Sequence, residues 1–349
     1  MAATDVARDV DTLQDLYGAL PERHLAPLWT MQGALTPVPV TAMVPHLWRW
    51  EDVRAYMVRA GELISAEDAD RRVLAFRNPG TADHELARST DTLWAAVQMV
   101  LPGEVAPPHR HTAAALRYIA EGTDGYTVVN GDRLPMEVGD VTLTPAWTWH
   151  EHGNTGDGPM FWIDGLDLPM VAALKGVFAE FDATGADGPP PPASSTRALR
   201  TGELLPRLDP HPSPRARTLT YRYADAMASF DALRDREGSP YDDLLLEYRD
   251  PRTGGPALPT LTASLQLLRP GVHTRAHRHT ASAVYHVAEG AGHTIVDGIR
   301  LDWSRGDTFA VPVWARHEHA NESGADAVLF SFSDAPVLEH LGLARTQEE

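Results

Sequence analysis

The spacing of hydrophobic and polar residues changes after the first part of the chain. Up to about residue 75, apolar side chains recur every three or four positions, as in VARDVDTLQDLYGAL (6–20) and WEDVRAYMVRAGELI (50–64), which predicts helices. From DTLWAAVQMVLPG (91–103) onward, short alternating runs are broken by glycine, proline, asparagine and aspartate, which predicts antiparallel sheet. We therefore expect a helical arm over residues 1–90 followed by a mainly β protein.

Two stretches of the chain have nearly the same sequence. HRHTAAALRYIAEG (109–122) returns as HRHTASAVYHVAEG (277–290) at an offset of 168 residues. GDVTLTPAWTWHEHGN (139–154) aligns with GDTFAVPVWARHEHAN (306–321) at an offset of 167, so one deletion separates the two registers. So many glycines, prolines and histidines in register indicate an internal duplication, and each half is expected to fold as the same β unit.

A proline-rich stretch divides the two copies. DATGADGPPPPASSTRALRTG (182–202) contains four consecutive prolines, which cannot continue a helix or a sheet and favour an extended spacer. A chain of 349 residues is long enough for two domains with substantial cores. We expect a first β domain over 91–182, a linker and inter-domain segment over 183–257, and a second β domain over 258–349.

Composition narrows the environment and the partners. Thirty Lys and Arg against 48 Asp and Glu give a formal charge of −18 without a basic cluster, so we expect neither nucleic acid nor an anionic membrane as partner. The chain has no cysteine, which gives no reason to expect an oxidising compartment and leaves histidine and carboxylate as metal ligands. Without an apolar leader or a long apolar run, we expect a soluble cytoplasmic protein.

The histidines are the strongest candidates for chemistry. His109 and His111 are two residues apart, so on a strand they project from the same face. A returning strand could add His150, with His152 on the same face as a neighbour. An isolated His-x-His pair is often only a polar surface pair, but this pair recurs, with a downstream histidine at a matched distance. We expect a metal site at His109, His111 and His150, and a possible second one at His277, His279 and His317.

The residues around these histidines resemble the two motifs of the cupin family. The matching positions are Gly103, His109, His111 and Gly122 for the first motif, and Gly139, Pro145, His150 and Asn154 for the second. Because both motifs recur in the second half, the chain resembles a bicupin, with two antiparallel β-barrel domains. The glutamate usual in the first motif is replaced by Ala115 and Ala283, which leaves three neutral histidines in each copy.

Within the bicupins, the sequence is similar to the gentisate, salicylate and 1-hydroxy-2-naphthoate dioxygenases. The stretches that carry this resemblance are PPHRHTAAALRYIAEG, LTPAWTWHEHGN, FWIDGLDLP and RRVLAFRNPG. The resemblance implies an oxidoreductase with one Fe(II) in its first cupin domain, no organic cofactor, extradiol-type ring cleavage with dioxygen, and a homotetramer. It points to gentisate as the aromatic 2-hydroxy acid, with maleylpyruvate as product. Three imidazoles by themselves could equally hold zinc, so the choice of iron rests on the resemblance.

The same resemblance assigns substrate contacts. Arg117 would meet the substrate carboxylate, for which its guanidinium offers a two-pronged match, and His152 would exchange protons with substrate or oxygen. Arg72 matches a second substrate-contacting arginine, with Arg71 beside it as the other possible register. Three further positions match pocket residues, namely Trp94 as an aromatic wall and Gln98 and Asp164 as polar groups.

The second copy differs at the substrate-handling positions. Arg117 aligns with Tyr285 and Asp164 with Ser331, so we expect catalysis at the first copy only. Three alternatives stay open from the sequence. The substrate could be salicylate or 1-hydroxy-2-naphthoate, the chain could be a non-enzymatic storage or ligand-binding bicupin, or the barrel could serve a zinc or manganese isomerase or hydrolase.

Overall fold

The computed structural model describes residues 10–31, 33, 35–69, 71–82, 86–181 and 219–349. Residues up to Val40 form one unit and Thr41–Glu349 form another. In the first unit, α1 (Leu13–Ala19) is capped by the Thr12 side chain and is followed by the short 3₁₀ helices η1 (Pro21–Arg23) and η2 (Leu28–Thr30). The proline-rich stretch 182–202 lies outside the described residues.

The segment expected as a helical arm is helical only in part. Its second half contains helices α2 (Trp50–Leu63) and α3 (Ala66–Ala69), and also strands β1 (His46–Trp48) and β2 (Arg72–Ala75). These short apolar runs, HLW and RVLA, join sheets of the second unit. Long-range pairing therefore decides their conformation, and the spacing of neighbouring residues does not.

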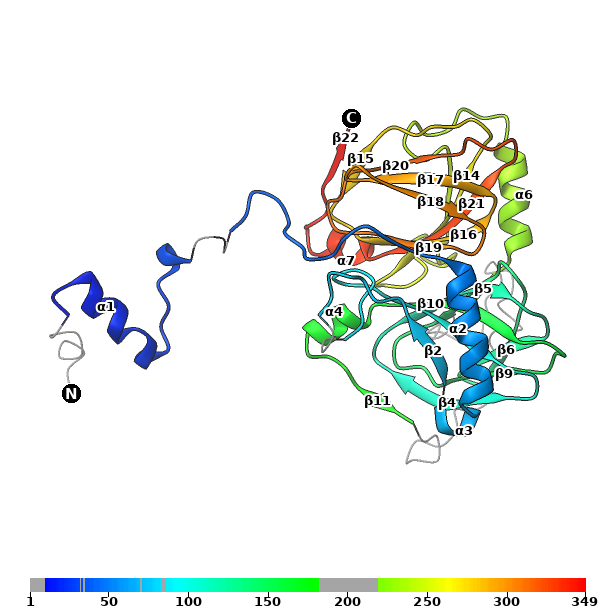
Figure 1. The fold of residues 1–349 in the computed structure, drawn as a ribbon, viewed down its shortest axis with the longest axis horizontal. Coiled ribbons are helices and arrows are strands. Elements are labelled where there is room, and N and C mark those ends of the chain that lie inside the picture. Colours follow the sequence, from blue (N-terminus) through cyan, green and yellow to red (C-terminus); the bar gives the residue numbers. More distant parts are fainter. Residues whose placement is uncertain (1–9, 32, 34, 70, 83–85, 182–218) are drawn as a thin grey trace. The chain divides into compact units, whose positions relative to one another are not determined.

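The second unit holds two β barrels, shown in Figure 1. The strands of the first are β3 (Trp94–Val100), β4 (Val105–His111), β5 (Ala115–Glu121), β6 (Gly125–Val129), β7 (Asp132–Met136), β8 (Val141–Thr144), β9 (His150–Asn154) and β10 (Met160–Leu166), followed by α4 (Leu168–Ala173) and β11 (Ala179–Glu180). The strands of the second are β14 (Thr262–Leu268), β15 (His277–His279), β16 (Ala283–Glu289), β17 (Ala291–Val296), β18 (Ile299–Ser304), β19 (Thr308–Val311), β20 (His317–Ala320) and β21 (Ala327–Ser333), followed by α7 (Ala335–His340) and β22 (Thr346–Glu348). Among the described residues, each barrel combines a six-stranded and a five-stranded antiparallel sheet.

The structural repeat is longer than the aligned sequences. Before the second barrel, β12 (Thr220–Tyr221), α6 (Tyr223–Leu233) and β13 (Leu244–Glu247) repeat the order of β1, α2 and β2. The leading strands are exchanged, because β1 pairs with β19 of the second barrel whereas β12 pairs with β8 of the first. Each half therefore completes a sheet of the other.

An aspartate in each barrel anchors the exchanged segment. Asp307 accepts hydrogen bonds from the Trp50 backbone N–H at 2.8 Å and from Arg49 at 2.9 Å. In the other half, Asp140 accepts from the Tyr223 backbone at 3.0 Å and pairs with Arg222. Because buried carboxylates need such partners, these pairs fix where each exchanged segment docks.

The aromatic residue of each segment also reaches the opposite barrel. Trp50 lies on Gly306 of the second barrel and donates from Nε1 to Glu121 of the first at 2.8 Å. Tyr223 lies on Gly139 of the first barrel, and its hydroxyl donates to Glu289 of the second at 2.7 Å. Both contacts tie the barrels together.

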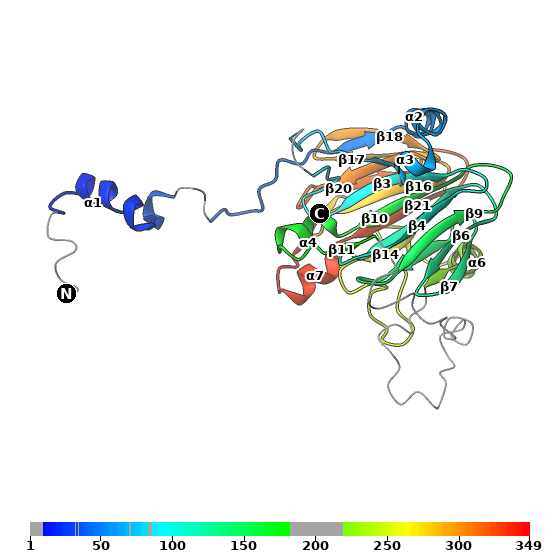
Figure 2. The same cartoon turned by 90° about the horizontal axis from the view of Figure 1, so that it is seen from below.

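The main apolar core lies between the two barrels, where their six-stranded sheets face each other (Figure 2). Phe332 of the second barrel packs so closely on Gly165 of the first that a Cβ there would lie 2.7 Å from the ring. The interior of the second barrel is filled by one apolar cluster. That of the first is split into two smaller clusters. No described helix is long and apolar enough to cross a membrane.

Candidate metal centre and active site

Three histidines of the first barrel converge at one point. His109 and His111 come from β4 and His150 from β9, and His109 and His150 are direct partners across the two strands. One ring nitrogen of each lies within 4.8 Å of the others. The same-face prediction for His109 and His111 is thus confirmed, and the three side chains form a donor set of the size that a metal ion needs.

The backbone fixes how these rings are turned. The Nδ1 atoms of His109, His111 and His150 lie 3.1, 2.7 and 2.9 Å from carbonyl oxygens two residues away in each case. A carbonyl can only accept, so each Nδ1 carries the hydrogen and each Nε2 presents a lone pair. The buried Nε2 of His150 has no hydrogen-bond partner among the described residues. This unsatisfied atom fits a bound metal.

Burial keeps the histidines neutral. Loss of solvent is the main cause that lowers the pKa of His109 to about 3 and that of His111 to about 4. It also holds the pKa of His150 well below its ordinary value. Neutral imidazole is the form that binds a metal, so the site is ready for one at neutral pH.

Beside the histidines, an arginine and an aspartate face each other on adjacent strands. Arg117 of β5 and Asp164 of β10 are direct partners, with Nε and Oδ1 3.0 Å apart. Both side chains are buried, and these two atoms are not aligned for a hydrogen bond. The other Asp164 oxygen accepts from the Trp162 indole at 3.2 Å, and Arg117 also donates to Thr144. The pair thus places a cation beside the metal centre.

Two further polar side chains are buried without partners. His152 has both ring nitrogens unbonded, and Gln98 has an unbonded Nε2, among the described residues. An unpaired buried polar atom costs on the order of 1–3 kcal/mol. Such groups are retained where a ligand can complete them, so both fit a role in binding.

The structure separates the two neighbouring arginines. Arg72 is buried and holds Glu104 with both terminal nitrogens, while its Nε donates to the Ile64 carbonyl at 2.8 Å. The charge of Arg71 contributes to the lowered pKa of His109. Arg72 is therefore held in an ion pair with Glu104, and the charge of Arg71 reaches the histidines.

Comparison with known proteins agrees with this architecture. The Cupin domain model matches residues 96–166 and 264–333. The chain is 38% identical over 334 residues to gentisate 1,2 dioxygenase 1 of Aquipseudomonas alcaligenes, covering 95% of each chain. It is 41% identical over 343 residues to the 5-aminosalicylate 1,2-dioxygenase of a Comamonas species, covering 96% of this chain and 90% of the relative.

The chain belongs to the gentisate and salicylate 1,2-dioxygenase family. A solved structure of salicylate 1,2-dioxygenase from Pseudoaminobacter salicylatoxidans, described as adducts with gentisate, matches with a TM-score of 0.86 and 35% identity, covering 98% of this chain and 95% of that chain. The predicted family and the predicted bicupin fold are both confirmed.

The second cupin domain holds a similar donor set, with one hydrogen bond to the rings fewer. His277, His279 and His317 also place ring nitrogens within 4.8 Å of one another. The Nδ1 atoms of His279 and His317 lie 2.7 and 3.1 Å from backbone carbonyls. The Nδ1 of His277 is buried without such a partner among the described residues. One of the three rings is therefore not fixed in the metal-binding orientation by a hydrogen bond.

The neighbours of this second set are already satisfied. The Nδ1 of His319, the counterpart of His152, is bonded to Thr294 at 2.8 Å, and Trp303 donates to the same hydroxyl at 2.9 Å. Gln266, the counterpart of Gln98, donates to the Asp242 carbonyl at 2.8 Å. The second cupin domain thus uses internal hydrogen bonds where the first leaves its groups unbonded.

Each third histidine follows a turn built in the same way. Trp147 and Trp314 have positive φ angles of 58° and 60°, a conformation that large side chains seldom adopt and that needs support from the fold. Their backbone N–H groups donate to the backbone carbonyl oxygens of His111 and His279 at 2.7 and 2.9 Å. The turn therefore ties the third ligand's strand to the second ligand.

Some site residues were not foreseen from the sequence. Trp162 donates to Asp164 and lies against His152, with ring centroids 5.2 Å apart. Its spacing of two from Asp164 could have revealed it, because both belong to one face of a strand. Phe181, stacked over His109 at 6.4 Å, carries no comparable sequence signal, since it follows a short edge strand. Trp94 packs against an apolar cluster and is partly buried.

Proposed function

We propose that this protein cleaves the aromatic ring of a 2-hydroxybenzoate with dioxygen, at a single Fe(II) held by His109, His111 and His150. Gentisate is the proposed substrate and maleylpyruvate the product. The names of the relatives support this choice, because they are dioxygenases of gentisate, 5-aminosalicylate and salicylate. Salicylate and 1-hydroxy-2-naphthoate are the alternative substrates.

One contrast between the duplicated domains carries the proposal. The first domain buries polar atoms of Gln98 and His152 without partners, whereas their counterparts Gln266 and His319 are hydrogen-bonded within the protein. Because burying an unbonded polar group is costly, the first domain is built to be completed by a ligand. The same reasoning disfavours the storage alternative, in which neither copy needs such groups.

Fe(II) bound to three neutral histidines would leave positions open for exogenous ligands and would supply the redox chemistry with dioxygen. The protein's own part is to bind and orient the acid. Arg71 and Arg117 offer guanidinium groups to its carboxylate, and Asp164 holds the plane of Arg117. We assign the second substrate-contacting arginine to Arg71 and not to Arg72, because Arg72 is ion-paired with Glu104.

His152 is the proposed proton-handling residue. Burial holds its pKa well below the ordinary value, so its imidazole is neutral and can accept a hydrogen bond from the substrate's hydroxyl. Gln98 can hydrogen-bond the same substrate through its unbonded amide. Trp94 remains the proposed aromatic wall, beside Ala96, whose small side chain shares its face of β3.

The second cupin domain is proposed to bind metal without turning over substrate. His277, His279 and His317 keep the donor set, but Tyr285 and Ser331 stand where the first domain has Arg117 and Asp164. A substrate carboxylate there would lack its cation, and a buried unpaired charge is strongly disfavoured. We also propose that the protein is a homotetramer and works in the cytoplasm.

The test loads the full-length protein with Fe(II) under anaerobic conditions and adds oxygen with each of the three acids in turn. We expect oxygen uptake matched one to one by loss of gentisate, with both oxygen atoms recovered in the product by mass spectrometry. Oxygen uptake with salicylate or 1-hydroxy-2-naphthoate alone would reassign the substrate. Retention of zinc or manganese with no oxygen uptake would favour the hydrolase or isomerase alternative.

A further inference from the structure

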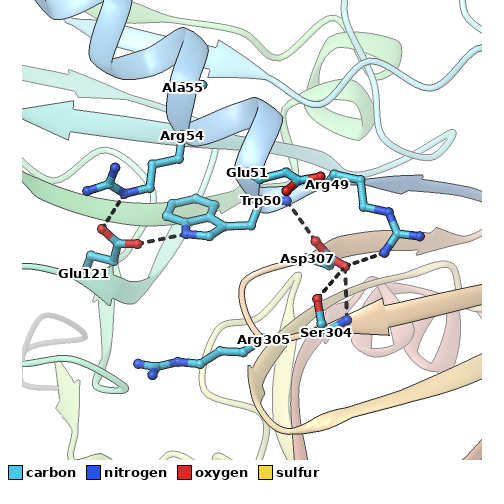
Figure 3. A pocket seen from close by; sticks show the side chains of 9 residues that line it. All are labelled: Arg49, Trp50, Glu51, Arg54, Ala55, Glu121, Ser304, Arg305 and Asp307. Atoms are coloured by element: carbon cyan, nitrogen blue, oxygen red, sulfur yellow. Dashed lines mark hydrogen bonds and ion pairs between the residues drawn. The ribbon is translucent and has the colours of Figure 1, made fainter.

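A cavity lies where the two cupin domains meet, and no histidine of either set lines it. Its volume is about 600 Å³, and it opens beside the first turn of α2. Figure 3 shows Trp50 at its centre, joined to Glu121 of the first domain and Asp307 of the second. The cavity is thus formed by the exchanged segment and both domains together.

In this cavity, each carboxylate oxygen of Glu121 and Asp307 already accepts a hydrogen bond. The two Glu121 oxygens accept from Trp50 Nε1 and Arg54 Nε, each at 2.8 Å. The two Asp307 oxygens accept from the Trp50 backbone, Arg49 and Ser304. Their negative charge is therefore compensated by groups that are fixed in place.

The arginines, in contrast, have donors to spare. Arg305 makes no hydrogen bond or ion pair with any described residue, and its side chain extends alone in Figure 3. Arg54 uses only its Nε on Glu121, which leaves its two terminal nitrogens without an acceptor among the described residues. In a chain of formal charge −18, the uncompensated guanidinium of Arg305 and the remaining N–H donors of Arg54 offer a place for an anion.

The duplication shows that these donors are not needed for the fold. The equivalent junction around Tyr223 keeps the aspartate, the arginine and the glycine, but Met227 stands in place of Arg54 and Val138 in place of Arg305. The contacts of the aspartate, the arginine and the glycine that hold the exchanged segment are therefore made in both halves. The two extra arginines are therefore an addition to one of them.

We propose that this cavity binds a small oxyanion, a phosphate or carboxylate group, through Arg54 and Arg305. Guanidinium forks match the spacing of the oxygens in such groups, and the Trp50 ring supplies an apolar wall. The exposed Glu51 also lines the cavity and opposes the anion. Its counterpart in the other half is Ala224.

The other half of the chain supplies the test variants. Inorganic sulfate and acetate are titrated by calorimetry into the full-length protein at low ionic strength. We expect Arg305→Val and Arg54→Met each to weaken binding about tenfold or more, which is the loss of one charge-assisted contact. Glu51→Ala is expected to tighten binding about threefold. Arg59→Ala, which changes an exposed arginine of α2 that does not line the cavity, is expected to leave binding within about twofold.

Stronger binding of sulfate identifies a phosphate-type ligand, and stronger binding of acetate a carboxylate. The proposal is overturned if the wild-type protein binds neither anion, or if Arg305→Val and Arg54→Met bind both as tightly as wild type. All three cavity side chains reach solvent, so we expect the variants to fold, and their melting temperatures check this directly.

Discussion

Arg117 and Asp164 form an ion pair across β5 and β10, with both side chains buried and Nε 3.0 Å from Oδ1. Burial raises the pKa of Asp164 to about 6 although the arginine opposes the shift. Above that pH the pair is fully charged. Because Arg117 is one of the two cations proposed to bind the substrate carboxylate, the pair links the stability of the barrel to the proposed recognition of the substrate.

Replacing Arg117 and replacing Asp164 are expected to have different effects, the first on activity and the second on stability. Arg117→Lys keeps the charge but not the planar fork, so we expect kcat/KM with gentisate to fall about 100-fold while the protein stays folded. Asp164→Ala leaves a buried cation unpaired, which is expected to cost about 3–5 kcal/mol in the free energy of unfolding. Urea unfolding and steady-state oxygen uptake measure the two effects. Wild-type kinetics in Arg117→Lys would remove the arginine from the substrate site.

The two histidine sets give a matched pair of metal variants. His111→Ala is expected to remove iron from the first domain and to abolish oxygen uptake, because two neutral imidazoles hold the ion poorly. His279→Ala changes the equivalent ligand of the second set and is expected to leave most of the uptake. Iron per chain is measured beside activity. Loss of activity in a folded His279→Ala protein that keeps its first iron would contradict catalysis at one domain only.

Arg71 and Arg72 are expected to separate into a functional and a structural residue. Arg71→Ala should lower kcat/KM about tenfold or more with an unchanged melting temperature. Arg72→Ala breaks the pair with Glu104, so it should lower the melting temperature by several degrees, since a 1 kcal/mol change shifts it by about 2–4 °C in a domain of this size. The reverse pattern would restore Arg72 as the substrate contact.

His286 makes the interface between the domains sensitive to acid. It lies against Tyr118 of the first domain, with ring centroids 5.1 Å apart, and burial, aided by the charge of Arg305, lowers its pKa to about 3. The unfolded chain takes up this proton near pH 6.5 and the folded protein does not. Stability present above pH 6.5 is therefore lost as the pH falls toward 3, by about 1.5 kcal/mol between pH 6.5 and 5.

We expect His286→Gln to remove that part of the pH dependence. Urea unfolding of the iron-loaded protein and the variant at four pH values between 5 and 7.5 gives the two slopes, and their difference isolates this residue. Equal slopes would show that His286 is protonated in the folded protein or hydrated there.

The contact of Gly306 with Trp50 predicts a strong effect of one methyl group. Gly306 has a φ of +91°, and an added Cβ would lie 2.5 Å from the Trp50 ring. Gly298 has a similar φ of +82° but nothing within 4 Å of an added Cβ. Backbone strain is expected to lower the free energy of unfolding of both alanine variants by about 1–2 kcal/mol. Gly306→Ala should lose at least about 1 kcal/mol more, because its Cβ meets the Trp50 ring. Equal losses in thermal unfolding would mean that Trp50 moves aside freely.

The sequence predicted those features of the fold and the site that depend on residues close together in the chain. The spacing of His109 and His111, the match between the two copies and the strand textures predicted the barrels and the first donor set. The family resemblance placed Arg72 at the site and left Arg71 open, because two adjacent residues of an extended segment point to opposite sides and one residue of register decides between them.

What the sequence did not show depends on contacts between distant segments. The pairing of β1 with β19 joins residues that share no local pattern, so residues 46–48 were expected to belong to a helical arm. The repeat of R-W in 49–50 as R-Y in 222–223 was visible, but its meaning required the two aspartates across the domain junction.

The exchange of leading strands also sets an order of events during synthesis. Trp48 of β1 pairs with Thr308 of β19, 260 residues later in the chain (308 − 48). A ribosome adds about 5–20 residues per second, so β1 has no sheet to join for on the order of ten seconds or more. The first barrel likewise waits for β12 before its sheet is complete. Because β12 emerges before the second barrel, the first barrel can complete its sheet early, whereas β1 must stay soluble and unpaired until β19 emerges. Docking of β1 is therefore the late step that joins the two halves.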